Sequence, residues 1–173
     1  AAGQSLTTGT GNFFMGRLAG RNITASSNNV CIGSQAGDGI SGAFSNHNVG
    51  IGADALSAAL TTGLSTAVGG SALVNSTGQG NTGIGYNAGN TTTSGANVTC
   101  IGHDAEASSA TASNEITLGD ANVATLRCNT QTISSLSDAR DKTDVQELPE
   151  GLDFISKLNP VKFQWQTRDG NGK

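Results

Sequence analysis

The densest group of side chains that could do chemistry lies late in the chain, in the segment SSLSDARDKTDV, from Ser134 to Val145. It brings hydroxyl, carboxylate, guanidinium and amine groups together within a few residues, whereas the preceding chain is sparsely charged. A hydroxyl becomes an effective nucleophile when a neighbouring base accepts its proton. Taken by itself, the segment is typical of a solvated, charged turn.

Two further groups of polar side chains could bind a ligand. The segment GHDAE, Gly102 to Glu106, could hold a cation through His103, Asp104 and Glu106, and three copies about an axis would form a ring. Tyr86 and His103 could touch a sugar. Solvated turn residues are the simpler interpretation of both groups, so we predict no metal site and no cofactor.

Charge divides the chain near residue 130. Only three basic and six acidic residues precede Ser137, and no lysine precedes Lys142. The net charge is −4 without a basic stripe, which argues against a nucleic-acid partner. No apolar run approaches the roughly 20 residues of a membrane span. Glycine, at 25 of 173 residues, is about twice its usual share, and only 4% of residues are aromatic, so we expect a narrow core.

A nine-residue unit recurs through the first 122 residues. It has the form N-[TV]-x-[IV]-G-x-x-A-[GL], and its central glycine, called the pivot glycine below, recurs at spacings of 17, 19, 17, 16, 17 and 17 residues. Seven in-phase copies at a near-constant period indicate a repeat architecture. The pivot glycines are Gly16, Gly33, Gly52, Gly69, Gly85, Gly102 and Gly119.

The positions around each pivot glycine predict a short strand followed by a tight bend. β-Branched or aromatic residues stand three places before the glycine and apolar residues immediately before it, which is the alternation of a strand. Alanine stands three places after it in six copies and Asn122 in the last, indicating close backbone approach and an atypical end. The residues before the glycine are expected to face inward: Met15, Ile32, Ile51, Val68, Ile84, Ile101 and Leu118.

These patterns predict an all-β fold, a parallel β-solenoid or β-roll of about seven repeats of ~17 residues. Glycine in every turn and β-branched columns oppose a helix. Each turn offers only two or three apolar side chains, so we expect three chains to share an axis as a homotrimer. The unit resembles repeats of phage tail-fibre and appendage proteins. It is also similar to the head repeats of trimeric autotransporter adhesins, which are left-handed parallel β-rolls with a commonly shorter repeat.

The three cysteines are expected to be free. Cys31 and Cys100 occupy the same repeat position four turns apart, about 19 Å at the spacing of adjacent strands. A disulfide requires Cα atoms within about 7 Å, so we expect these two residues to be small buried filler. No CxxC or zinc pattern involves them or Cys128.

The pattern changes again after residue 145. Leu152, Ile155 and Leu158 fall on one face of a short predicted helix, and NPVKFQW alternates as a strand led by Pro160. We expect this to be the beginning of a compact α/β unit that continues beyond Lys173.

The end of the chain resembles the opening of the intramolecular chaperone domain of the S74 peptidase family, found at the C-terminus of phage tail spikes, tail fibres and neck appendages. The resemblance covers residues 137–173. Its signature, S-D-x-R-x-K, then an apolar helix, then P-V-x-F-x-W, corresponds to Ser137, Asp138, Arg140, Lys142, Leu152 to Leu158, Pro160, Val161, Phe163 and Trp165.

The resemblance implies self-cleavage of the Leu136–Ser137 bond, with Ser137 as nucleophile, Lys142 as its base, and Asp138 and Arg140 in support. A lysine base must lose its proton, which requires burial, whereas the neighbouring aspartates favour the charged form. Residues five apart do not share a helix face, so a loop or a neighbouring chain must bring the pair together. The only enzymatic activity we expect is therefore a single-turnover serine peptidase, and whether this chain cleaves stays open.

The expected organisation is a solenoid over 1–122, a connector over 123–136 and the N-terminal part of the chaperone over 137–173. We expect a structural virion protein, made in the host cytoplasm, that forms part of a trimeric tail fibre or appendage for host attachment. Its expected partners are two identical chains, other tail proteins and a host glycan or outer-surface protein. The alternatives are a bacterial trimeric surface adhesin and a glycan-degrading tail spike, for which acids in the repeats are sparse.

Overall fold

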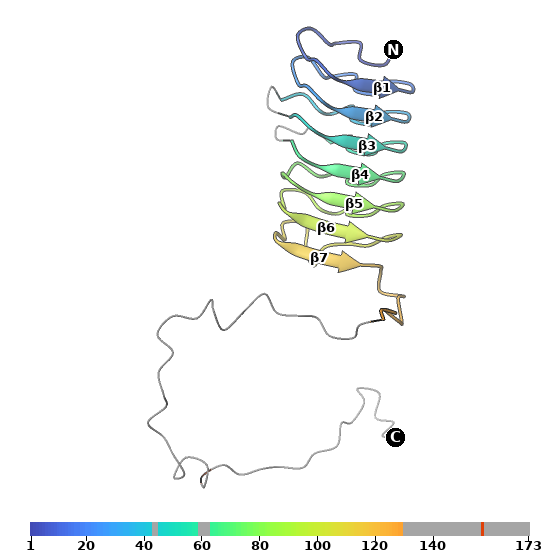
Figure 1. Cartoon of the computed structure of the whole chain (residues 1–173), viewed down its shortest axis with the longest axis vertical. Coiled ribbons are helices and arrows are strands. Elements are labelled where there is room, and N and C mark those ends of the chain that lie inside the picture. Colours follow the sequence, from blue (N-terminus) through green and yellow to red (C-terminus); the bar gives the residue numbers. More distant parts are fainter. Residues whose placement is uncertain (43–44, 59–62, 130–156, 158–173) are drawn as a thin grey trace. The chain divides into compact units, whose positions relative to one another are not determined.

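The computed structural model describes residues 1–42, 45–58, 63–129 and Lys157. By its internal contacts the chain divides into two units, Ala1–Arg127 and Cys128–Lys173. The first unit is a parallel β-solenoid in which each coil contributes one short strand to a single sheet, which confirms the predicted all-β fold (Figure 1). The strands are β1 (Phe13–Met15), β2 (Val30–Ile32), β3 (Val49–Ile51), β4 (Thr66–Val68), β5 (Thr82–Ile84), β6 (Val98–Ile101) and β7 (Glu115–Leu118).

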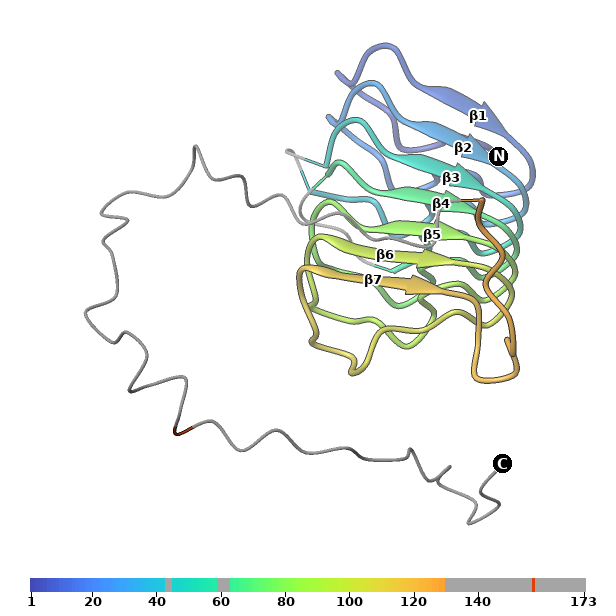
Figure 2. The same cartoon turned by 60° about the horizontal axis from the view of Figure 1, so that its bottom comes forward.

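The sheet order follows the chain order, β1 to β7, and every neighbouring pair is parallel (Figure 2). Equivalent repeat positions face each other, so that Cys31 pairs with Gly50 and Gly50 with Ala67. The ladder continues past the strand ends. From the second pivot glycine to the seventh, each N–H donates to a backbone carbonyl of the previous coil, that of the residue just before its pivot glycine, at 2.7–2.8 Å. The ~17-residue sequence period is thus one coil of the solenoid. Among the described residues, no helix is long and apolar enough to cross a membrane.

The predicted orientation of the strands is wrong. The residues before the pivot glycines face outward, as shown by exposed fractions of 57% for Met15, 41% for Ile84 and 52% for Leu118. The middle residue of the strand faces inward instead. This inner column is buried in β2 to β6, where it consists of Cys31, Gly50, Ala67, Gly83 and Cys100.

Space inside the coil explains this orientation. At Gly83, an added Cβ would lie 2.8 Å from Cγ of Leu73, which enters the interior from the far side of the coil. At Gly37, an added Cβ would lie 2.4 Å from Sγ of Cys31. In β2 to β6 the interior therefore accepts only small residues from the strand, and the larger aliphatic residues take the outer face, whereas Phe14 of β1 packs against the core in the first coil.

Large side chains reach the core from two alternating positions beyond the strand. In the first two coils, the position four places after the pivot glycine is a glycine, and the position seven places after it is a buried isoleucine, Ile23 or Ile40. In the next two coils, the position four places after the pivot glycine is instead a buried leucine, Leu56 or Leu73. The position seven places after the pivot glycine is then Ser76 in the coil of Leu73. Each of these coils thus carries one large aliphatic residue opposite the strand. The alanines three places after the pivot glycine, as predicted, are fully buried: Ala19, Ala36, Ala55, Ala72, Ala88 and Ala105.

A buried asparagine ladder precedes the strands. Oδ1 of Asn12 accepts hydrogen bonds from N and Nδ2 of Asn29, and Oδ1 of Asn29 accepts from N and Nδ2 of Asn48, at 3.0–3.1 Å. Asn48 Oδ1 accepts from the N–H of Ser65, which holds the next place in the column. Each rung links one coil to the next, so the ladder fixes the register of the coils as well as satisfying buried amides.

Candidate functional site

The predicted cleavage residues, Leu136, Ser137, Asp138, Arg140 and Lys142, lie outside the described residues. Of the predicted helix 152–158, only Lys157 is described, and there the backbone is helical and the side chain is exposed. The pairing of Ser137 with Lys142 therefore stays a prediction. The described candidate surfaces all belong to the solenoid.

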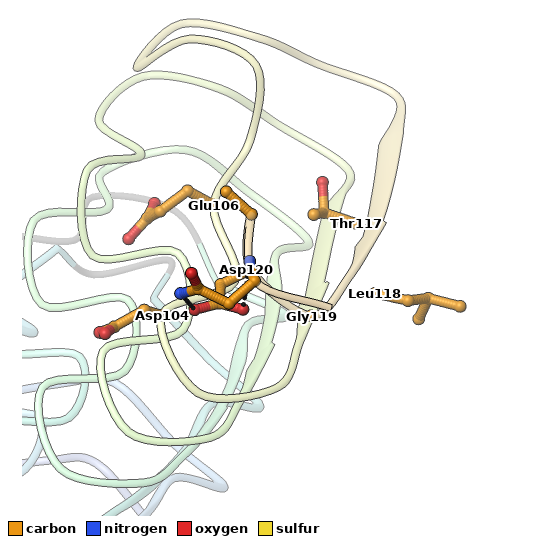
Figure 3. A pocket seen from close by; sticks show the side chains of 8 residues that line it. Asp104, Glu106, Thr117, Leu118, Gly119 and Asp120 are labelled. Atoms are coloured by element: carbon orange, nitrogen blue, oxygen red, sulfur yellow. Dashed lines mark hydrogen bonds between the residues drawn. The ribbon is translucent and has the colours of Figure 1, made fainter. Parts of the chain in front are cut away.

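The last coil carries an open depression of about 610 Å³, lined by side chains of β7 and of the bends around it. Asp104, Glu106 and Asp120 are its acidic residues, whereas Leu118 points away from it (Figure 3). Three carboxylates in one depression raise two possibilities that the sequence also raised, a cation site and an acid pair for glycan cleavage. Whether either is possible depends on which hydrogen-bond and ionic partners these carboxylates already have.

Each carboxylate of the depression already has partners in its own coil or the coil before. Glu106 accepts from the N–H groups of Asn90 and Thr91, at 3.0 and 3.1 Å, and from the Thr91 hydroxyl. Asp104 accepts from Asn87 Nδ2 at 3.0 Å and lies 3.1 Å from Nδ1 of His103. These contacts hold adjacent coils together and leave few lone pairs for a ligand.

Asp120 is held in its ionised form. The side-chain amide and backbone N–H of Asn122 donate to its carboxylate, at 2.7 and 3.1 Å, and lower its pKa below the ordinary value. A general acid for glycoside cleavage needs the opposite shift. Among the described residues, no group of three or more His, Cys, Asp or Glu side chains is placed to hold a metal ion, and this includes His103, Asp104 and Glu106.

Tyr86 and His103 form a stacked pair on neighbouring coils. Both follow a pivot glycine directly, so the one-coil repeat places their rings 5.7 Å apart at an interplanar angle of 21°. Tyr86 is 56% exposed. The stack lies on the bends that follow β5 and β6. Neither ring lines the depression described above, and the stack stabilises the contact of two coils.

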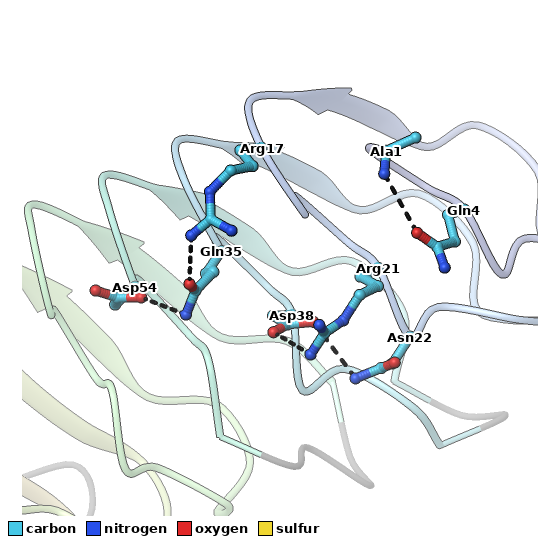
Figure 4. Close-up of polar contacts among 8 residues, drawn as sticks. All are labelled: Ala1, Gln4, Arg17, Arg21, Asn22, Gln35, Asp38 and Asp54. Carbon is cyan, nitrogen blue, oxygen red and sulfur yellow. Dashed lines mark hydrogen bonds and ion pairs between the residues drawn. The ribbon is translucent and has the colours of Figure 1, made fainter.

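The same bend carries polar ladders in the first coils (Figure 4). Arg17 donates to Gln35 at 2.9 Å, and Gln35 donates to Asp54 at 3.1 Å, each residue standing one coil from the next. Arg21 forms an ion pair with Asp38 at 2.9 Å. Contacts between exposed side chains, such as Arg17 with Gln35, contribute little individually, whereas the ion pair of Arg21 is partly buried because Asp38 is buried. We assign these contacts to the stacking of the coils.

The cysteines confirm the prediction made for them. Cys31 and Cys100 are fully buried in the inner column and free, and Cys128 is free and exposed. Burial raises the pKa of Cys31 to about 12. The pKa of Cys100 rises to about 11, because of burial first and then the charges of Glu106 and Glu115. Both thiols are therefore protonated at neutral pH, and the thiolate is the reactive form.

We expect Ellman's reagent to modify one thiol per native chain at pH 7.5 and three after unfolding in urea. The native reaction should disappear in Cys128→Ser, since burial shields the other two thiols and keeps them protonated. Rapid native labelling of Cys31 or Cys100 in that variant would contradict a closed coil interior.

Sequence reasoning missed one surface altogether, the outer face of the sheet. The two outward columns consist of apolar residues and threonines, and the column immediately before the pivot glycine was predicted to face inward because all its residues are apolar. The signal that could have revealed the true orientation is size. In β2 to β6 the middle column consists of cysteine, glycine and alanine, and a ~17-residue coil with a leucine or isoleucine in its interior has room for little more.

Comparison with known proteins identifies one segment. The family model for the S74 peptidase family, described as the chaperone of endosialidase, matches residues 137–173. The match begins at Ser137 and supports a chaperone segment of this family at the end of the chain. No curated protein and no solved structure matches the chain.

Proposed function

We propose that the chain is part of a homotrimeric phage tail fibre or appendage that serves host attachment, and that its terminal segment is the beginning of an intramolecular chaperone. The observation that carries this proposal is the match of residues 137–173 to the chaperone of endosialidase, in a chain whose preceding part is a parallel β-solenoid. A polar, elongated repeat joined to a folding aid suits a virion structural protein.

The solenoid itself gives a physical reason for such a folding aid. Its coils are near-identical, so a coil can pair with the wrong neighbour at little initial cost. Each parallel strand pair forms only after the intervening chain of about one coil has closed, so the entropy of loop closure is lost before the pairing contacts are gained. A terminal segment that joins three chains first would start all three solenoids in the same register.

The proposed release of the chaperone is cleavage between Leu136 and Ser137. In this mechanism, Lys142 accepts the proton of the Ser137 hydroxyl as Oγ attacks the Leu136 carbonyl. The Ser137 nitrogen leaves as an amine with that proton, and water then hydrolyses the ester to give a Leu136 carboxylate. Asp138 and Arg140 would hold the loop in which the pair meets. Lys142 must be neutral to act, so this loop must be shielded from water in the assembled state.

Mass spectrometry of the purified full chain tests the proposal. We expect cleavage before Ser137, seen as one fragment that ends at Leu136 and one that begins at Ser137, and an intact chain in Ser137→Ala. Ser135→Ala, a matched change two residues away, should cleave normally. We also expect Lys142→Met to stay intact, because it keeps a long side chain without a base. An uncut wild-type chain that forms stable trimers would overturn the self-cleavage step, and a monomeric wild-type chain would overturn the trimeric fibre.

A further inference from the structure

The outward face of the sheet is unusually apolar for a surface. Two residues of every strand project from it, and together they form what we call the outer strip. Eleven of these fourteen residues are apolar, three are threonines, and none is charged. The strip consists of Phe13, Met15, Val30, Ile32, Val49, Ile51, Thr66, Val68, Thr82, Ile84, Thr99, Ile101, Ile116 and Leu118.

The strip inverts the usual arrangement of a half-exposed sheet. Such a sheet normally points its large apolar residues at the core and polar residues at the solvent. Here the inner column of β2 to β6 holds Cys31, Ala67 and similar small residues, whereas Ile51, Ile84 and Ile101 are outside and 36–41% exposed. A continuous apolar face of this extent marks an interaction surface.

We infer that the outer strip is the surface through which three copies of this chain assemble, with the solenoids parallel and in register around a common axis. The inference rests on the trimeric fibre proposed above and adds which face of the solenoid makes the contact. It commits to a second and third copy of this chain as the occupants.

The geometry of the strip favours another copy over a different partner. Seven strands at about 4.8 Å spacing give a straight strip about 29 Å long, with side chains repeating at every strand. An occupant must match that repeat along its full length, and an equivalent strip does so by construction. The absence of charge also leaves no electrostatic feature for an unlike partner to recognise.

The strip has the size of the apolar middle of a standard protein–protein interface. A standard interface uses about 20–30 residues a side, with an apolar middle and a polar rim. The fourteen strip residues supply the middle, and the polar bends on either side, including Arg17 and Gln35, supply a rim.

Cyclic symmetry fixes the register within such an assembly. When the symmetry axis runs along the stacking direction of the coils, every strip residue meets its own equivalents. The bulky ends, with Phe13 at one and Ile116 at the other, then face like residues, and the threonines of β4 to β6 face threonines. In an antiparallel or slipped arrangement, residues of different strands, with side chains of different size, would face each other.

A charge in the middle of the strip tests the inference. In a Ser137→Ala background, which keeps the chain length constant, we expect light scattering to give three times 17.3 kDa for the parent and 17.3 kDa for Ile84→Glu. Asn75→Glu, which adds the same charge at an exposed position between β4 and β5, should remain trimeric. Circular dichroism should show the β-structure of the parent in both variants.

The outcomes separate this inference from the proposed function. Trimeric Ile84→Glu would overturn the strip as the interface and leave the trimeric fibre standing, whereas a monomeric parent would overturn both. If Ile84→Glu fails to fold, Ile84→Cys and Asn75→Cys in a Cys128→Ser background decide the matter. A bismaleimide of about 10 Å, the spacing of packed sheets, should join chains through position 84 and not through position 75. The reverse pattern would overturn the inference.

Discussion

Gly52→Ala is expected to lower the free energy of unfolding by about 4 kcal/mol, because two separate costs fall on one methyl group. Gly52 has a φ of 132°, a conformation that L-residues rarely adopt. Its added Cβ would also lie 2.4 Å from the carbonyl oxygen of Gly69 in the next coil. That carbonyl belongs to the backbone, so no side-chain rotation relieves the contact.

The stacking of the pivot glycines makes this cost hard to avoid. A Cβ on Gly69 would in turn meet the carbonyl of Gly85 at 2.2 Å, so displacing one pivot glycine presses it against the next. A loss of this size corresponds to a melting temperature about 8–16 °C lower for a chain of this length. The measurement is thermal unfolding followed by circular dichroism at one fixed chain concentration, since assembly affects the midpoint.

Gly50→Ala is the matched control, two residues earlier in β3. Gly50 is not in the left-handed region, and the nearest atom to its added Cβ is the Ala55 oxygen, at 3.2 Å. Its neighbour across the ladder is already alanine, Ala67. We expect a loss of about 1 kcal/mol or less. Equal losses in the two variants would contradict the special role of the pivot glycine.

Asn48→Ala is expected to cost about 3 kcal/mol, the second largest effect. Asn48 is fully buried, and its side chain donates to Asn29 Oδ1 and to the Ser45 carbonyl at 3.0 and 2.9 Å while accepting from Ser65 N. Alanine leaves the Ser65 N–H without this acceptor and opens a small cavity. Urea unfolding measures the loss, with the slope of the transition expected to stay constant.

Two further variants serve as comparisons for the loss of stability in Asn48→Ala. Asn48→Ser should cost only about 1–2 kcal/mol, because serine keeps a hydroxyl oxygen in the column. The chain itself places Ser65 in the next rung, where its hydroxyl accepts from Asn81 N at 3.3 Å. Asn75→Ala removes an exposed asparagine that donates to the Asn90 carbonyl, and should change stability by less than about 0.5 kcal/mol. A loss for Asn75→Ala as large as that for Asn48→Ala would refute the ladder's contribution.

Much of the architecture was predictable because it is periodic. The regular return of the pivot glycine, the alternation before it and the alanine after it determine short parallel strands, one per coil, stacked in chain order. The buried alanines and the free, buried Cys31 and Cys100 follow from the same columns. The signature from Ser137 to Trp165 predicted the chaperone segment by residue type and order, and the family match to residues 137–173 supports it.

Local sequence determined the repeat, the strands and the residues with the potential for cleavage chemistry, because bends, alternation and motif order are properties of neighbouring residues. Only the tertiary structure decided which face of the strand is inside. A period of two defines two faces without orienting them, and here the far wall of the coil orients them. Leu56, Leu73, Ile23 and Ile40 fill the interior from that side, so the strands turn small residues inward and leave their large aliphatic residues on the outer strip.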